Sequence, residues 1–373
     1  MERVWFSMQE SYDQRFCLSP DVAEMVLSDQ EIEATLDFLC SEQRESGFIP
    51  WTACSHGDPW NHSEVVIALL LGGRFEEARK GLDWILYSQN QDGSLCQYYL
   101  PSGVKEPKRD LNCCSYPYLA LLLGIELGVL DIDEALLRSY MVSSVKYILS
   151  YQDSAGGFPW AVDPDGQPYE GRLLSGSSSM VTSFQAAIEI MKQLSLDPSE
   201  LAVAEKALSS LVVKSRLENF LDKSVWAMDW YYPILAKGAE VEEYQHRVSH
   251  LFADNFEPGY GVCCLSTSRW VTTAETAEFA MALSIVGRQV EAENVLKMTS
   301  QMRWRDGSYL TGVTVPSMRS FPNGERSTYS AAAVIIANSV LSNPGGELLT
   351  SLRPKAPNNV TKICTILNSS ELT

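Results

Sequence analysis

The chain is short of positive charge and of long apolar runs. Its 29 lysines and arginines face 47 aspartates and glutamates, which gives a formal net charge of -18. A charge of this sign repels a phosphate backbone and an anionic lipid surface, so nucleic-acid binding is not expected. No apolar run reaches about 18 residues, the length of a membrane-spanning helix, and the start MERVWFSMQE does not read as a secretory signal. We therefore expect a cytoplasmic protein without stable membrane insertion, whose partner is a small molecule.

The cysteines lack the pattern of a disulfide-bonded protein. There are nine, an odd number, and adjacent pairs occur at Cys113-Cys114 and Cys263-Cys264. Adjacent cysteines are poor material for an ordered disulfide framework, so reduced and mostly buried thiols are expected.

A break that recurs along the chain is its most informative feature. A segment with helical apolar spacing ends in a polar turn, usually with a glycine, and aromatic residues follow. The six copies, of which the fourth is degenerate, are CSEQRESGFIPW (40–51), SQNQDGSLCQYY (88–99), SYQDSAGGFPWA (150–161), NFLDKSVWAMDWYY (219–232), NFEPGYGVCC (255–264) and QMRWRDGSYLTG (301–312). This self-similarity indicates six structural repeats.

Each repeat is predicted to contain two helices. Amphipathic segments precede the turns and are expected to form outer helices, over 30–40, 75–88, 133–151, 200–217, 240–252 and 290–302. The segments that follow, such as SEVVIALLLGG and AETAEFAMALSIVG, are apolar nearly all round, which is typical of buried inner helices. Six inner and six outer helices closed into a ring predict an all-α, single-domain (α/α)6 toroid over residues 29–342. An N-terminal arm (1–28) and a partly disordered tail (343–373) are expected beside it. The alternative, an open solenoid, needs polar capping repeats at its ends.

The connections predict where the site lies. Turns from inner to outer helices are short, whereas those from outer to inner helices are long and varied. A site is therefore expected where the long loops meet the N-termini of the inner helices. Side chains at these starts are candidate substrate-binding residues: Trp60, Asn61, Asn112, Tyr116, Trp230, Tyr231, Tyr232, Trp270, Glu325 and Tyr329. The SGSSS run at 175–179 is interpreted as a flexible linker.

Four acidic residues and one histidine are candidate catalytic residues, and each has a structural alternative. Glu278 lies one turn beyond any capping position and is the strongest candidate. Glu275 follows Thr272 at the spacing of a capping box, so it is either a cap or a catalyst. Asp229 reads equally as an N-cap and as a catalyst, Asp58 also reads as a turn residue, and His62 also reads as a hydrogen-bonded structural residue.

Arginines on the long connections form a third pattern. Arg109, Arg172 and Arg269 would make an anion site if they converge near helix N-termini. Such a site suits a phosphate, a diphosphate or a uronate, and a diphosphate would bring Mg²⁺ as a possible cofactor.

The repeats resemble those of the terpenoid-cyclase and protein-prenyltransferase toroids. QNQDGSL, YQDSAGGF and QMRWRDGSY carry the resemblance to the repeat, while DPWNH, MDWYYP, WVTTAETAE and DGSYLTG look like bacterial proteins loosely labelled prenyltransferase or squalene-cyclase-like. The resemblance covers roughly residues 30–341. It implies an aromatic-lined central cavity in which an acid such as Asp229 or Glu278 protonates an isoprenoid, and aromatic faces stabilise the cation.

The chain departs from this family at its metal motifs. No histidine follows His250, so the zinc ligands of prenyltransferases are incomplete and zinc is not expected. No Asp-Asp pair exists, and the nearest approach to a cyclase motif, DIDEA, falls in an inner-to-outer turn. Two alternatives therefore remain beside the isoprenoid enzyme: a carbohydrate-active enzyme of the glycosidase or polysaccharide-lyase type, and a toroid that binds a lipid or peptide without catalysis.

Overall fold

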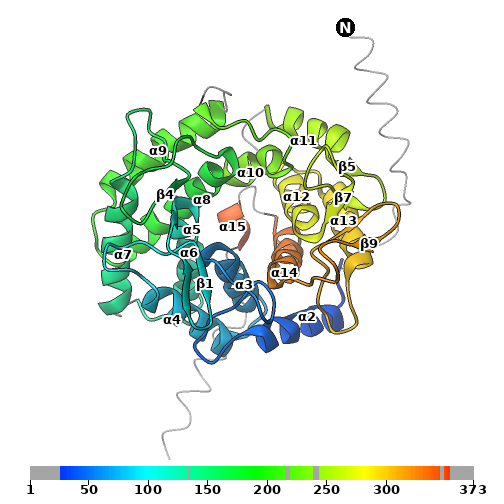
Figure 1. Cartoon of the computed structure of the whole chain (residues 1–373), viewed down its shortest axis with the longest axis horizontal. Coiled ribbons are helices and arrows are strands. Elements are labelled where there is room, and N and C mark those ends of the chain that lie inside the picture. Colours follow the sequence, from blue (N-terminus) through cyan, green and yellow to red (C-terminus); the bar gives the residue numbers. More distant parts are fainter. Residues whose placement is uncertain (1–25, 133–134, 215–218, 238–242, 345–347, 353–373) are drawn as a thin grey trace, which may run out of the picture.

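A closed ring of helices forms the body of the protein (Figure 1). The computed structural model describes residues 26–132, 135–214, 219–237, 243–344 and 348–352. The inner helices are α3 (Pro59–Leu71), α6 (Pro117–Glu126), α8 (Leu174–Gln193), α10 (Met228–Lys237), α12 (Thr273–Ile285) and α14 (Thr328–Ser342). The outer helices are α2 (Asp29–Glu42), α4 (Phe75–Tyr87), α7 (Ala135–Leu149), α9 (Ser199–Lys214), α11 (Glu243–Asp254) and α13 (Gln289–Met298). The predicted (α/α)6 toroid is confirmed. Of the predicted arm, residues 1–25 lie outside the described residues, as do 345–347 and 353–373 of the predicted tail.

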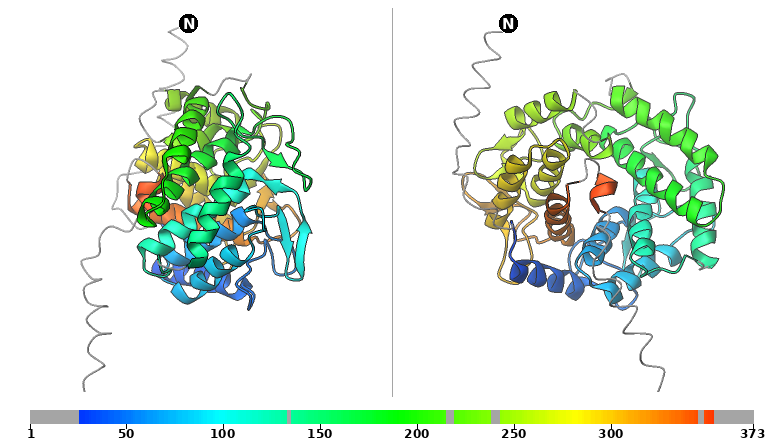
Figure 2. Two further views of the ribbon diagram at one scale, coloured as in Figure 1. Left: turned by 90° about the vertical axis from the view of Figure 1, so that its left-hand side faces the viewer. Right: turned by 180° about the vertical axis from the view of Figure 1, so that it is seen from behind.

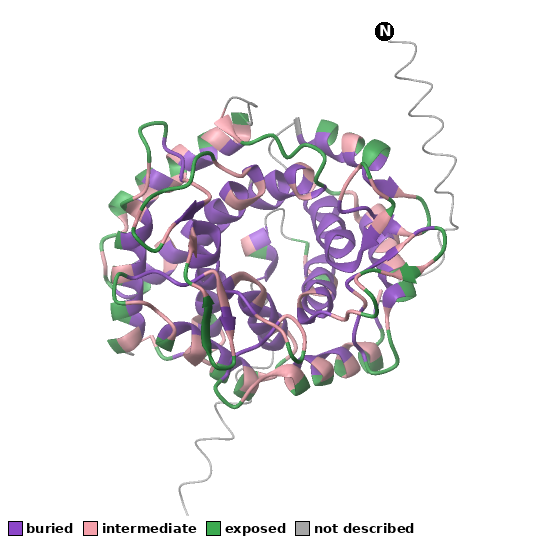
Figure 3. Ribbon diagram, viewed as in Figure 1, coloured by how far each residue is buried: buried purple, intermediate pink, exposed green. Residues whose placement is uncertain are grey.

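The two sets of helices differ in burial as their sequences predict (Figure 3). Every residue of α12 is buried, because its neighbours in the ring cover it on all sides. Outer helix α4 buries only one face, with Ala78, Leu82 and Ile85 packed inward. Removal of these apolar side chains from water is the main stabilising term of the ring. No described helix is both long and apolar enough to cross a membrane.

The recurring turn packs against the outer helix of the next repeat. In the second copy, the Asn90 N–H donates to the Ser94 carbonyl (2.8 Å) and the Gly93 N–H donates to the Asn90 carbonyl (2.9 Å). Gly93 has φ of 94°, and a Cβ there would lie 2.2 Å from the Ser143 carbonyl oxygen of α7. Glycine is needed because only it combines this backbone conformation with so close an approach. Gln89 precedes the turn and donates to the Tyr140 carbonyl (3.0 Å), which ties the turn to α7.

The same contact closes the ring between its two ends. A Cβ on Gly307, in the last turn, would lie 2.2 Å from the Ala34 carbonyl oxygen of α2. Arg303 also donates to the Glu31 carbonyl (3.2 Å), and α14 packs against both α2 and α3. The ring is thus closed by segments almost three hundred residues apart, which an open solenoid would not be.

Short strands stand on one face of the ring, seen at the right of the left-hand view of Figure 2. They belong to the long outer-to-inner connections and form two-stranded pairs and one three-stranded sheet. Their bounds are β1 (Tyr98–Leu100), β2 (Gly103–Glu106), β3 (Arg109–Asp110), β4 (Ala161–Val162), β5 (Phe256–Glu257), β6 (Gly261–Val262), β7 (Trp270–Thr272), β8 (Gly312–Thr314) and β9 (Arg319–Ser320). Two short helices, α5 (Leu111–Ser115) and the 3-10 helix η3 (Thr299–Met302), adjoin this scaffold. We call this side of the molecule the loop face.

The interpretation of SGSSS as a flexible linker is wrong. Residues 175–179 form the first turns of α8, and most of them are buried. Ser178 donates to the Leu174 carbonyl (2.7 Å), and Ser179 donates to the side chain of Asn112. Small residues serve here because α5 and α6 pack closely against this part of α8.

A further short helix, α15 (Leu348–Leu352), lies inside the ring in the views from both sides (Figures 1 and 2). It packs against α14 and, across the ring, against α8. Its Leu348 and Leu352 line the same cavity as Ile67 and Ile336, which are about two helical turns from the start of their helices. α15 therefore covers the central cavity below the level of the loop face.

Candidate active site

The first turns of the inner helices converge at the centre of the loop face. The Trp60 ring of α3 lies 5.5 Å from the ring of Tyr116 and 5.7 Å from that of Tyr232 on α10. These separations are typical of aromatic pairs in direct contact. Since Tyr116 precedes α6 and Tyr232 lies on α10, Trp60 brings the starts of three inner helices into contact.

Below Trp60, Glu278 of α12 accepts hydrogen bonds from three tyrosines. Tyr231 and Tyr232 of α10 donate to it, the latter at 3.1 Å, and Tyr329 of α14 donates from the other side. Burial, together with the nearby Glu64 carboxylate, raises the pKa of Glu278 to about 8, although the tyrosine hydrogen bonds act in the opposite direction. Glu278 is only 1% exposed. Its carboxyl group thus holds three inner helices together, and burial favours its protonated form.

Glu64 of α3 is the second buried carboxyl group at this depth. It accepts hydrogen bonds from the Tyr116 hydroxyl and from the Trp60 indole N–H (3.3 Å). Burial raises its pKa to about 7. Glu64 was not among the predicted site residues. The sequence signal that could have identified it is its place on the same apolar helix as Trp60, one turn later.

The cavity between Glu64 and Glu278 is small. Its volume is about 20 Å³, room for roughly one water molecule, and Leu348 and Leu352 of α15 form part of its wall. No sugar or isoprenoid fits there as the ring stands. The next hollow toward the loop face lies at the level of Trp60.

At that level, a second hollow of about 60 Å³ opens between α3, α5 and α8. Its lining includes Trp60 and Asn112, two of the predicted substrate-binding residues, together with Asp110, Trp160 and Ser175. Trp160 was missed by the sequence analysis because it lies in a repeat turn and not at a helix start. We call this hollow the mouth pocket.

Asp58 and Asp110 sit next to each other and both begin helices. Asp58 caps α3 by accepting from the Asn61 N–H (2.9 Å) and from the Asn61 side chain. Asp110 caps α5 by accepting from the N–H groups of Asn112 (2.9 Å) and Cys113 (3.2 Å). Burial raises the pKa of each to about 6, and the charge of Asp110 adds to the effect on Asp58. Capping accounts for their positions, and the raised pKa values leave both able to hold a proton near neutral pH.

Asp229 is not the N-cap of α10. It lies within the first turn, and its carboxylate accepts from the backbone N–H of Ser175, a residue of the mouth pocket. Arg247 is bound to the Asp229 carbonyl oxygen (2.9 Å). Burial raises the pKa of Asp229 to about 6, against the lowering effect of the Ser175 hydrogen bond. Its carboxyl group thus does not cap α10; it satisfies a first-turn N–H of α8 and stands beside the mouth pocket.

Glu275 is not part of a capping box either. Thr272 ends β7, where it pairs with Gly312, and its side chain caps no backbone N–H of α12. Instead the Thr272 hydroxyl donates to the Glu275 carboxylate. The capping interpretation is wrong because strand pairing already places Thr272, and the glutamate is left in the first turn of α12, where the helix dipole favours negative charge.

His62 faces away from the ring centre. Its Nδ1 accepts from the Ile49 N–H (3.2 Å), and its Nε2 lies 2.9 Å from the Gly81 carbonyl oxygen of outer helix α4. This pairing requires the neutral Nε2–H tautomer. Burial lowers the pKa of His62 to about 4. The prediction of a catalytic role is wrong, because the imidazole is fully used in joining α3 to the outer layer.

Two tryptophans predicted to line the cavity also point elsewhere. Trp230 stacks on His250 of outer helix α11 at 3.5 Å and donates to the Ser224 carbonyl (2.7 Å). Trp270 packs edge-on against Phe321 and donates to its carbonyl (2.8 Å). Both stabilise loops. Glu325 accepts from the Trp51 indole (3.0 Å) and from Thr311 (2.9 Å) at the edge of the loop face.

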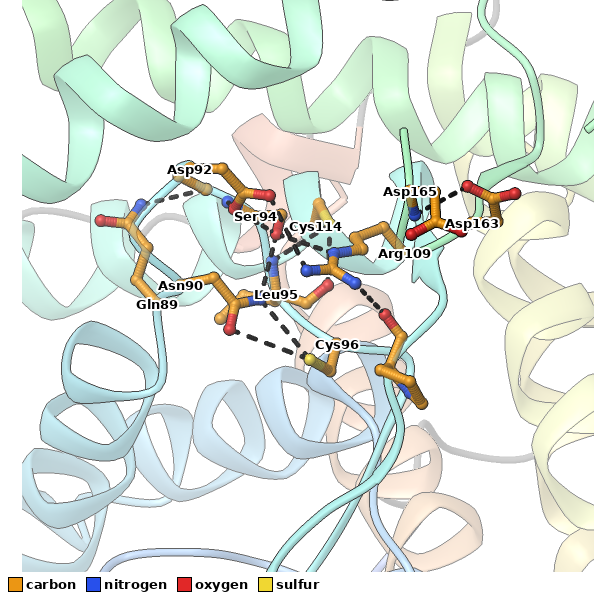
Figure 4. A network of polar contacts seen from close by, with 12 residues as sticks. Gln89, Asn90, Asp92, Ser94, Leu95, Cys96, Arg109, Cys114, Asp163 and Asp165 are labelled. Atoms are coloured by element: carbon orange, nitrogen blue, oxygen red, sulfur yellow. Dashed lines mark hydrogen bonds and ion pairs between the residues drawn. The ribbon is translucent and has the colours of Figure 1, made fainter. Parts of the chain in front are cut away.

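The arginines do not converge. Each is paired with an acidic residue of its own or a neighbouring loop. Arg109 binds Ser94 (3.2 Å) and lies 3.8 Å from Asp92 in a repeat turn (Figure 4). Arg172 binds Asp153 (2.8 Å), and Arg269 binds Glu257 (2.7 Å). The predicted anion site is therefore wrong, since these guanidinium groups are separated and neutralised.

The seven described cysteines are free thiols, as predicted, and five of them are buried. Among the described residues, no group of three or more His, Cys, Asp or Glu is arranged to hold a metal ion.

Comparison with solved structures places the ring among glycosidase folds. A structure described as a wild-type glycosidase matches with a TM-score of 0.67 at 15% identity, over 88% of this chain and all of the other. An alpha-amylase from Clostridium perfringens matches with a TM-score of 0.61 at 11% identity, over 86% of this chain and 99% of the other. At these identities the likeness concerns the fold alone. No protein-family model matches the sequence.

A relative in sequence identifies the family. The chain is 30% identical over 321 residues to the MMP endo-(1,4)-3-O-methyl-alpha-D-mannosidase of Mycolicibacterium hassiacum, which covers 85% of this chain and 88% of the relative. This match overturns the resemblance to terpenoid cyclases and prenyltransferases, and with it the predicted isoprenoid substrate and the Mg²⁺ that a diphosphate would bring. The repeats and aromatic helix starts that supported the resemblance are features that both kinds of toroid can share. The chain is an enzyme and belongs to the family of this endo-mannosidase.

Proposed function

We propose that the chain is a glycoside hydrolase that cleaves bonds within a mannose-containing glycan at the loop face. The single observation that carries the proposal is the family relationship to an endo-acting mannosidase. The position of the carboxyl groups supports it. Asp58, Asp229 and Glu275 stand at the starts of three inner helices, around the level of Trp60. We call these three the mouth carboxylates.

Hydrolysis of a glycosidic bond needs two carboxyl groups in different protonation states. One protonates the leaving oxygen, while the other activates water or attacks the sugar carbon. A group with a pKa near the working pH is the better acid. Burial raises the pKa of Asp58 and of Asp229 to about 6, so one of them is the proposed acid. Glu275, in the first turn of α12, is the proposed partner.

Glu64 and Glu278 have a different proposed role. The space beside them holds about one water molecule, so they do not touch the substrate. Their hydrogen bonds to Trp60, Tyr116 and Tyr232 fix the floor under the mouth pocket. We expect them to act as positioning residues, and the sequence prediction that Glu278 is the proton donor is replaced by this role.

The first experiment is hydrolysis of α-(1,4)-linked 3-O-methylmannose oligosaccharides, followed by the release of reducing ends. We expect Glu275→Gln to lower kcat by a factor on the order of 10² to 10⁴, the usual contribution of a general acid or base. Controls are Glu200→Gln and Asp197→Asn, which replace exposed acids at the start of α9 and just before it, and should keep the wild-type rate. No reducing ends from the wild type, or an unaffected Glu275→Gln, would sink the proposal.

The choice of leaving group separates the acid from its partner. An aryl mannoside with an activated phenol needs little protonation, because the phenolate leaves readily. We expect the variant that lacks the acid, Asp58→Asn or Asp229→Asn, to be slow on the oligosaccharide but nearly normal on the activated aryl substrate. Glu275→Gln should be slow on both. If neither aspartate variant shows this rescue, the assignment of the acid is wrong.

A further inference from the structure

Beside the mouth pocket, the loop face carries a larger groove. Its volume is about 610 Å³, within the range of ligand sites. Three segments form it: the third repeat turn, the loop before α8 and the stretch after α9. The lining residues used below are Tyr151, Asp153, Pro159, Tyr169, Arg172 and Phe220.

The groove and the mouth pocket are neighbours. Pro159 lines both, and Arg172 in the groove precedes Leu173, which lines the mouth pocket. Between them stands Trp160, whose ring lies 5.0 Å from that of Tyr169. A chain of sugars held at the mouth carboxylates therefore has an aromatic path outward over Trp160 to Tyr169.

The chemistry of the groove suits a glycan. Tyr169 is 41% exposed and Tyr151 and Phe220 are half-buried, so their rings are available at the surface. Aromatic faces bury the C–H face of a pyranose, and methyl ethers on the sugar would add apolar contact. Lys108 lies over both rings, 4.7 Å from the Trp160 centroid and 5.5 Å from that of Tyr169, which holds the two rings together.

The polar groups are held in place. Arg172 binds Asp153 (2.8 Å) and the Asn219 carbonyl (3.0 Å), and its own carbonyl accepts from the Leu221 N–H (2.9 Å). Gly171 has φ of 85°, and Leu221 packs so closely against it that a Cβ at this position would lie 2.6 Å from the leucine side chain. These contacts join the three segments into one wall. In the Arg172–Asp153 ion pair, the guanidinium can donate to sugar hydroxyl groups and the carboxylate can accept from them.

We propose that this groove binds sugar units of the same glycan chain beyond the cleaved bond, and so makes the enzyme prefer long substrates. The inference rests on the proposed function, because it takes the glycan to be cut at the mouth carboxylates. The inference adds the direction in which the glycan leaves the site, which is across Trp160 toward the third repeat turn.

The test compares a long 3-O-methylmannan with the shortest oligosaccharide that the wild type cleaves. For the double variant Tyr169→Ala/Phe220→Ala we expect KM for the long substrate to rise about tenfold, which corresponds to about 1.4 kcal/mol of binding. KM and kcat for the short substrate should stay within about twofold. Tyr87→Ala, which removes a 75% exposed tyrosine from outer helix α4, is the matched control.

Each outcome either supports the subsite or refutes it. If KM rises equally for both substrates, or for neither, the groove is not a subsite. Should the double variant unfold, Tyr169→Ala alone gives the same comparison, because that ring lies at the surface, and a change in product lengths from the long substrate is a second reading. If the wild type cleaves no glycan of either length, the proposed function fails and takes the groove assignment with it, which distinguishes the two failures.

Discussion

The buried carboxyl group of Glu278 makes stability depend on pH in a direction that can be worked out. Its pKa is about 8 in the folded chain, against 4.5 when unperturbed. Between these values the folded state keeps a proton that the unfolded state has released. Stability from this group is therefore full below pH 4.5 and is lost as the pH rises through 8.

The size of the effect follows from the width of that window. One pH unit within it is worth at most about 1.4 kcal/mol, so a rise from pH 5 to pH 8 lowers the free energy of unfolding by up to about 4 kcal/mol. Glu278→Gln keeps the shape and hydrogen-bonding capacity of the side chain but cannot ionise. We expect the variant to lose most of this pH dependence.

The assay is thermal or urea unfolding at pH 5, 6, 7 and 8, followed by tryptophan fluorescence, for the wild type and Glu278→Gln. The informative quantity is the difference between the two proteins at each pH, because other groups titrate in both. Glu200→Gln, a change on exposed surface, should run parallel to the wild type. If Glu278→Gln also runs parallel to the wild type, the carboxyl group is not protonated in the fold and the reasoning is refuted.

Three further changes test the framework around the site. Gly93→Ala should lower the melting temperature far more than Gly128→Ala: both have positive φ, but only at Gly93 does the new Cβ meet a backbone carbonyl, so the difference measured by calorimetry isolates that contact. His62→Ala should destabilise the chain by about 2 to 4 kcal/mol in urea unfolding, through a cavity and two broken hydrogen bonds, while kcat per folded molecule stays unchanged. Leu352→Ala should lower the free energy of unfolding by about 2 to 4 kcal/mol in the same assay, because this side chain is buried in the ring. An unchanged free energy would contradict the packing of α15.

Much of the fold was predictable because the repeat carries its own geometry. The glycine that approaches the neighbouring outer helix recurs at the same place in several copies of the turn. The inner segments have no polar face, so the sequence predicts that they are buried. The SGSSS run misled because small hydroxyl residues are typical of linkers and equally of helices packed at short distance. Only the partner, Asn112, distinguishes the two.

The convergence of the inner-helix starts was more predictable than the direction of each side chain. The convergence of inner-helix starts followed from loop lengths, which the sequence shows. The direction of each side chain could not be derived from loop lengths. His62 and Trp230 lie on the same helices as Trp60 and Tyr232, but they face the outer layer. The role of Thr272 was hidden for a similar reason: its strand partner, Gly312, is forty residues away. The substrate class was mistaken because an aromatic mouth with acids suits a carbocation and a sugar alike.

The closure of the ring by Gly307 against α2 has a consequence for synthesis on the ribosome. At about 5 to 20 residues per second, α2 and α3 emerge well before the last repeat exists. Until that repeat arrives, the face of α3 that will pack against α14 has no partner, so the growing chain exposes an apolar surface for many seconds. We expect the nascent protein to depend on chaperones late in translation, and truncations before residue 328 to aggregate even though most of their repeats are complete.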